Sequence, residues 1–137
     1  MPHSVEKLKD EPIIVVEIKN PYDYQTEPEQ MFEKIERIAK KTEKQGYIIY
    51  DCRNFTVTFG DLVAGMQAQS KGTPGSISDP KFTSMIIGSD AMLKMATEGF
   101  KQDQYGKIEV PLYSTMDAAM RHARTDKSQP SNVNPTA

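Results

Sequence analysis

The stretch Ile13-Ile14-Val15-Val16-Glu17-Ile18 decides the fold class of this chain. It is β-branched, of strand length and nearly continuous, which is typical of a strand covered on both faces. A helix is expected next, capped by Thr26 and ended by Gly46 in the left-handed conformation. Its apolar residues recur at helical spacing: Met31, Phe32, Ile35, Ile38 and Ala39. The run from Tyr47 to Cys52 follows as a second strand, and a connection of this length favours a parallel pair with a right-handed crossover.

The same alternation continues toward the C-terminus. Thr58 and Asp61 form the pattern of a capping box at the start of a second helix. Residues 72–80, rich in glycine, proline and serine, are expected to form a mobile loop. Phe82–Ile87 reads as a third strand, and a third helix begins at Gly88-Ser89-Asp90, where Ser89 is the expected cap.

A fourth strand and a fourth helix complete the pattern. The strand is expected over Ile108–Tyr113, at the edge of the sheet, because Pro111 cannot donate to a sheet ladder. Ser114 with Asp117 is expected to cap the last helix. The sequence therefore predicts an α/β fold: a single domain with a mostly parallel four- or five-stranded sheet packed by about four helices.

The length of 137 residues fits one domain rather than two. The composition of the two ends predicts a loosely ordered lead-in over residues 1–12 and a disordered tail over residues 125–137. The α/β domain is expected to occupy residues 13–124.

Charge and cysteine content narrow the function classes. The net charge of −2 gives no overall field that would attract nucleic acid. Cys52 is the only cysteine, so an intrachain disulfide and a cysteine-based zinc site are excluded, and a reducing compartment is expected. No run approaches the about 20 apolar residues of a membrane span. We expect a cytoplasmic protein without a cofactor.

Four segments carry a resemblance to a known family. They are Ile48-Ile49-Tyr50-Asp51, Phe55 to Leu62, Ser84 to Asp90, and Tyr113 to Met120. Over these segments the chain resembles the STAS domain of anti-sigma-factor antagonists, in particular its SpoIIAA-like branch. The resemblance covers roughly residues 13–124 and implies a small non-enzymatic module that binds a protein partner or, occasionally, a ligand.

The chain departs from this family at one informative position. STAS antagonists that are phosphorylated carry a serine at the start of the helix after the aspartate-ended strand. Here that stretch reads Thr58-Phe59-Gly60-Asp61, and capping is the commoner role of such a threonine. The sequence therefore predicts a module without the phosphoserine switch. By the resemblance, the partner would meet the helix that begins near Thr58 and the loop from Ser70 to Pro80.

Candidate binding residues lie where the strands end, because open parallel sheets bind ligands outside the carboxyl ends of their strands. Asp51 and Arg53 are expected on one face of a strand, where they form a catalytic or ion-binding pair or neutralise one another. Ser89 and Asp90 open a helix whose free N–H groups would suit an anion, although the Asp90 carboxylate would oppose one.

Common catalytic and metal signatures are missing from the sequence. His3 and His122 have no second histidine at ligand spacing, so no metal site is predicted. There is no Gly-x-Ser-x-Gly elbow and no P-loop ending. We therefore predict no catalytic residues.

Three functions remain open at this point. The first is a non-catalytic regulatory module that binds a protein partner or self-associates. The second is a small-molecule-binding protein or minor enzyme that uses the crevice at the strand ends. The third is a structural subunit of a homo-oligomeric assembly, with the fourth strand as a pairing edge.

Overall fold

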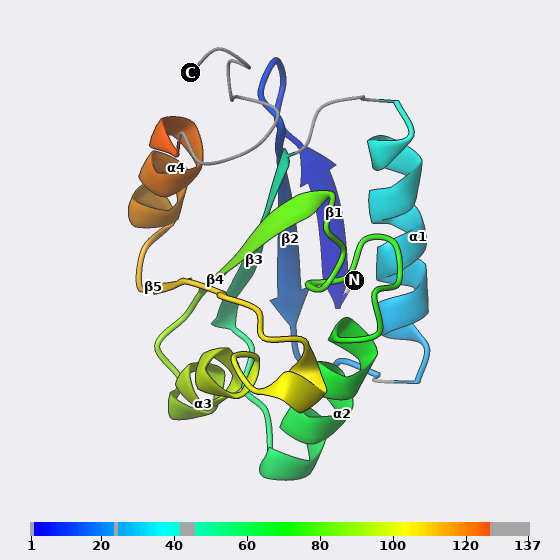
Figure 1. The fold of residues 1–137 in the computed structure, drawn as a ribbon, viewed down its shortest axis with the longest axis vertical. Coiled ribbons are helices and arrows are strands. Elements are labelled where there is room, and N and C mark those ends of the chain that lie inside the picture. The colour runs from blue at the N-terminus through cyan, green and yellow to red at the C-terminus, as the bar shows by residue number, and fades with distance from the viewer. Residues whose placement is uncertain (1, 24, 42–45, 127–137) are drawn as a thin grey trace.

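Five strands form one sheet in the order β1-β2-β3-β4-β5 (Figure 1) in the computed structural model, which describes residues 2–23, 25–41 and 46–126. The strands are β1 (His3–Lys7), β2 (Ile13–Lys19), β3 (Gly46–Asn54), β4 (Phe82–Ile87) and β5 (Leu112–Tyr113). The helices are α1 (Glu27–Ala39), α2 (Phe59–Gln69), α3 (Ala91–Gly99) and α4 (Met116–Thr125), with a 3-10 turn, η1 (Asp103–Tyr105). Strands β2 to β5 are parallel and β1 is antiparallel to β2. The predicted fold class is confirmed.

Alternate residues of each strand pack against different helices. Ile48 and Tyr50 of β3 belong to the larger core, together with apolar side chains of α1, α2 and α3. Tyr47 and Ile49 of the same strand belong to a second core, against α4. We call these sides of the sheet the three-helix face and the α4 face. Figure 1 shows α1 and α4 on opposite sides of the strands.

The first residues form a strand, which the sequence analysis did not expect. His3–Lys7 pair with β2, so the predicted loose lead-in is wrong for these residues. His3 is only 1% exposed, and its Nδ1 lies 2.5 Å from Glu27 Oε1. The ammonium of Lys34 can only donate, so His3 Nε2 accepts from it at 3.1 Å and the Nδ1–H donates to Glu27. These contacts attach β1 to α1.

The fourth predicted strand is correct in place and wrong in length. Only Leu112 and Tyr113 pair with β4, at the edge of the sheet, as Pro111 predicted. The Pro111 carbonyl still accepts from Ile86 N at 2.9 Å, although the proline has no N–H to offer a ladder.

The structure also corrects the prediction for Gly46 and adds side-chain contacts to the segment 72–80. Gly46 does not end α1 in the left-handed region; it begins β3, where a Cβ would lie 2.6 Å from the carbonyl oxygen of Pro12. The segment 72–80, expected to be mobile, is held by side chains: Gly72 N donates to Ser78 Oγ at 2.7 Å and Gly75 N to Asp79 Oδ2 at 2.8 Å.

The C-terminal boundary is only partly described. Thr125, assigned to the tail by its composition, is the last residue of α4. From residue 127 onward the predicted disordered tail lies outside the described residues. In the described part, the helices are all too short and polar to cross a bilayer.

Candidate functional site

Strands β2, β3 and β4 run parallel, so their carboxyl ends lie at the same end of the sheet. This end carries the predicted residues Asp51 and Arg53 near the end of β3, and Ser89 and Asp90 after β4. Helix α2, with Thr58 and Asp61 in its first turn, begins close after β3. The candidate residues therefore all lie at or just after the carboxyl ends of the strands.

Asp51 and Arg53 form a tight ion pair. Arg53 Nε donates to Asp51 Oδ1, and Arg53 Nη2 donates to Asp51 Oδ2, both at 2.8 Å. The backbone N–H of Arg53 adds a bond of 3.2 Å to Oδ1. These bonds lower the pKa of the Asp51 carboxyl below its ordinary value, against the effect of burial. The carboxylate is thus ionised and occupied by its neighbour, which matches the expected neutralising pair.

An amide clamp positions the segment that leads into α2. Asn20 Nδ2 donates to the Thr56 carbonyl at 3.0 Å, and Thr56 N donates back to Asn20 Oδ1 at 2.7 Å. The clamp joins the chain just after β2 to the chain just after β3. No local pattern indicates this clamp, because Asn20 and Thr56 lie 36 residues apart in the sequence.

Thr58 caps α2, as predicted. Its side-chain oxygen accepts from Asp61 N at 3.1 Å, so it satisfies one of the free N–H groups at the helix start. Leu62 and Met66 are the buried residues of this helix. Asp61 is its only charged residue, and Phe59 is 60% exposed.

The start of α3 differs from the expectation in one detail. Asp90, not Ser89, is the cap, and its carboxylate accepts from Met92 N at 2.8 Å. Ser89 is exposed and lies just outside the helix. Because a carboxylate already occupies the helix start, an anion there would meet negative charge. This geometry weakens the hypothesis of an anion site at Gly88-Ser89.

An apolar pocket of about 90 Å³ lies between α2, α3 and the sheet. Among the predicted site residues only Asp61 lines it; most of the lining is hydrophobic, such as Phe55, Leu62, Leu93 and Phe100. The Cys52 thiol also lines it, and burial raises the pKa of this thiol to about 12. A neutral thiol is a poor nucleophile. The pocket is therefore apolar and is not a crevice formed by the candidate residues at the strand ends.

A second polar group of contacts lies at α4 and also escaped the sequence analysis. His122 Nδ1 and the Tyr113 hydroxyl are 2.5 Å apart, and the Tyr47 hydroxyl donates to Asp126 Oδ2 at 2.6 Å. Thr115, not Ser114, caps this helix by accepting from Ala118 N. Among the described residues no cluster of His, Cys, Asp and Glu is arranged to hold a metal ion.

One solved structure has the same fold as this chain. No family model matches the chain, and no curated protein matches it significantly. The structure is similar to the crystal structure of an anti-sigma factor antagonist from Mycobacterium paratuberculosis, with a TM-score of 0.52. The similarity covers 89% of this chain and 92% of that chain at 16% sequence identity. The chain thus has the fold of an anti-sigma factor antagonist, as the STAS resemblance predicted.

Proposed function

We propose that this chain is a non-catalytic regulatory module that binds a protein partner through the outer surface of α2. The observation that carries this proposal is Phe59, a large aromatic side chain that is 60% exposed at the start of the helix. Aromatic residues are enriched among the side chains that dominate protein–protein binding. We define the α2 surface as the exposed residues of this helix, Phe59, Gly60, Ala64 and Gln67.

None of these exposed residues is charged, and Asp61, the only charged residue of α2, is half-buried. A helix that faces only water usually has charged and polar residues on its outer side. An uncharged outer side headed by an exposed aromatic ring is typical of a surface that another protein covers. Met95 of α3 is a second large apolar side chain that is exposed, at 47%.

The loop after α2 adds to the proposed contact region. Gln69 Oε1, at the end of α2, accepts from Ile77 N at 2.7 Å, and the Gln69 carbonyl accepts from Ser78 N at 3.1 Å. The loop is thereby fixed to the helix. A partner would meet a preorganised surface, which lowers the entropic cost of binding.

The fold supports a regulatory role, because the similar solved structure is that of an anti-sigma factor antagonist. We propose that this chain works without a phosphoserine switch. The position where such antagonists carry serine holds Thr58, whose oxygen caps α2 beside Asp61. A phosphate there would meet the nearby carboxylate, and like charges repel.

Two features weigh against the alternative of an enzyme at the strand ends. The Asp51 carboxylate is bound by Arg53 on both oxygens, so it has little basicity to offer. Cys52 is buried with a raised pKa. The free cysteine also fits the reducing cytoplasm that our proposal assumes.

The alternative of a structural subunit that pairs through the fourth strand is also less well supported. The strand β5, which would form the pairing edge, has only two residues.

The proposal is tested by affinity purification from the native cell lysate with quantitative mass spectrometry. Wild type is compared with Phe59→Ala and with the matched control Phe59→Leu, which keeps an apolar side chain. We expect a partner whose recovery falls at least about tenfold in Phe59→Ala and much less in Phe59→Leu. A partner recovered equally with all three proteins, or no specific partner, would contradict the proposal.

A further inference from the structure

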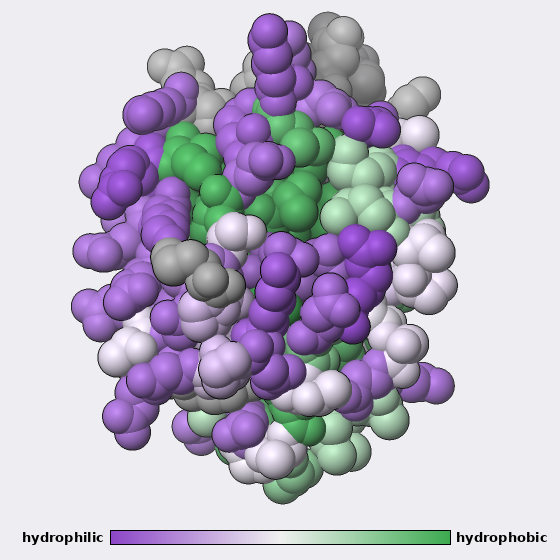
Figure 2. Space-filling model, turned by 180° about the vertical axis from the view of Figure 1, so that it is seen from behind, coloured by the Kyte–Doolittle hydropathy of each residue, from purple (hydrophilic) through white to green (hydrophobic). Residues whose placement is uncertain are grey.

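The α4 face of the sheet is covered over only part of its width. Helix α4 packs mainly against β3, β4 and β5, and no other described helix packs on this side. The described helices therefore leave the half formed by β1 and β2 open. Figure 2, seen from behind the view of Figure 1, shows apolar side chains gathered on part of this side with hydrophilic ones around them.

The apolar side chains of this area come from two segments. Leu8 and Val15 lie at the β1–β2 side, and Met116 and Met120 lie on α4. All of them are only partly buried, although they pack against the second core. We call them the open patch. A partly exposed cluster next to a core gains stability when another protein surface covers it.

Opposite charges border the open patch. Glu6 pairs in register with Val15, so the two side chains lie on the same side of the sheet. Arg121 is on α4, at the other border. Both residues are exposed, and neither has an ion-pair partner among the described residues.

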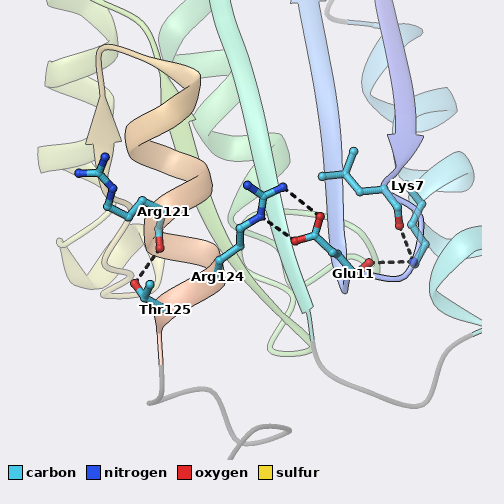
Figure 3. Close-up of polar contacts among 6 residues, drawn as sticks. Lys7, Glu11, Arg121, Arg124 and Thr125 are labelled. Atoms are coloured by element: carbon cyan, nitrogen blue, oxygen red, sulfur yellow. Dashed lines mark hydrogen bonds and ion pairs between the residues drawn. The ribbon is translucent and has the colours of Figure 1, made fainter.

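A neighbouring arginine is already used within the chain. Arg124 Nε and Nη2 donate to the two carboxylate oxygens of Glu11, at 2.7 and 3.0 Å (Figure 3). In the same view the Arg121 side chain extends away from that pair. Arg121 is therefore available to an outside acid, whereas Arg124 holds the β1–β2 turn against α4.

We propose that the open patch is the interface of a symmetric homodimer. In a two-fold interface the contacts are reciprocal: where one residue of the first copy contacts a second residue of the partner, that second residue of the first copy contacts the first residue of the partner. The face has a raised half, formed by α4, and an open half, formed by β1 and β2, so two copies fit by placing each α4 beside the open half of the other. The same operation brings Glu6 of each copy toward Arg121 of its partner. Shape and charge are both self-complementary.

A stable dimer must bury a minimum area on each copy. Stable interfaces bury about 800 Å² on each partner, roughly a tenth of the 7955 Å² accessible surface of this chain. An interface of that area must extend beyond the four apolar side chains of the open patch and include its charged borders. The inference is independent of the proposed function, because the α2 surface belongs to the other side of the sheet and stays free in the dimer.

The test is sedimentation equilibrium of the full chain over about 1 µM to 1 mM, a range that spans weak to moderate self-association. We expect a concentration-dependent mass that rises to twice the 15.4 kDa of one chain. Glu6→Arg and Arg121→Glu should each raise the dissociation constant about tenfold, equivalent to about 1.4 kcal/mol, because each reversed contact occurs twice. The double variant with both changes should restore dimerisation. Reversals at the exposed Glu33 and Arg37 of α1 provide the matched control and should change nothing.

Two results would overturn the inference. One is a mass of one chain throughout the concentration range, which would leave the open patch to a different protein. The other is a dimer that Glu6→Arg and Arg121→Glu do not weaken, or that the double variant does not restore, because such a dimer uses another surface. Both borders are exposed, so the variants should fold, and a wild-type circular dichroism spectrum checks this.

Discussion

Replacing Gly88 by alanine should destabilise the protein through a single close contact at the carboxyl end of β4. Gly88 follows β4, and a Cβ built on it lies 2.3 Å from Leu93 Cδ1 in α3. Ordinary contact begins at 3.4 Å, so the leucine methyl must move by about an ångström. Leu93 is only 5% exposed, and overpacking of this kind costs about 1–3 kcal/mol.

The effect of Gly88→Ala on stability should reverse in sign when Leu93 is shortened. Leu93→Ala alone should cost about 2–5 kcal/mol, because it leaves a cavity in the core. In that background the methyl that obstructs Gly88→Ala is gone, and the backbone at Gly88 is not left-handed. Gly88→Ala should then stabilise by about 0.4–1 kcal/mol, because alanine restricts the unfolded chain.

Urea denaturation followed by far-ultraviolet circular dichroism measures the cycle, since the chain has no tryptophan. Gly60→Ala is the matched control: its Cβ would meet only Thr58 Oγ1, at 4.0 Å, so the substitution should be neutral or stabilising. Costs of Gly88→Ala and Leu93→Ala that add within about 0.5 kcal/mol would refute the reasoning.

Three further predictions concern single groups. The lowered pKa of the Asp51 carboxyl means that its ion pair stabilises the fold fully at pH values above the ordinary carboxyl pKa of about 4. This stabilisation is lost as the pH falls through the pKa of the folded state. The difference in unfolding free energy between wild type and Asp51→Asn, measured in urea titrations, should therefore shrink from pH 6 to pH 2. A constant difference would count against a folded-state ion pair. His3→Ala should destabilise by about 2 kcal/mol or more by leaving the Glu27 carboxylate unpaired, whereas the exposed neighbour change Ser4→Ala should cost less than about 0.5 kcal/mol in the same assay. Cys52, with a pKa raised to about 12, should react with a thiol reagent only at the rate of unfolding, and rapid labelling of the native protein would disprove its burial.

Much of the fold could be predicted from the sequence because the signals are local. The continuous apolar run of β2 and the helical spacing of the apolar residues in α1 are each contained in one short segment of sequence, and both elements lie where expected. Pro111 predicted the edge position of β5 for an equally local reason, since a proline cannot donate to a ladder wherever it stands. At the site, Asp51 and Arg53 are two residues apart on one strand, so their pairing needed no tertiary knowledge.

The tertiary structure alone decided the features that depend on distant residues. β1 has a weak local signal, since Val5 is its only apolar residue. It becomes a strand because β2 offers an edge and because Glu27 and Lys34 hold His3. Asn20 clamps Thr56 for the same kind of reason. Which helices cover which face of the sheet also follows from packing. The sequence by itself therefore determined an alternating α/β domain, whereas the exposure of Phe59 and the half-covered α4 face arose only when distant segments packed together.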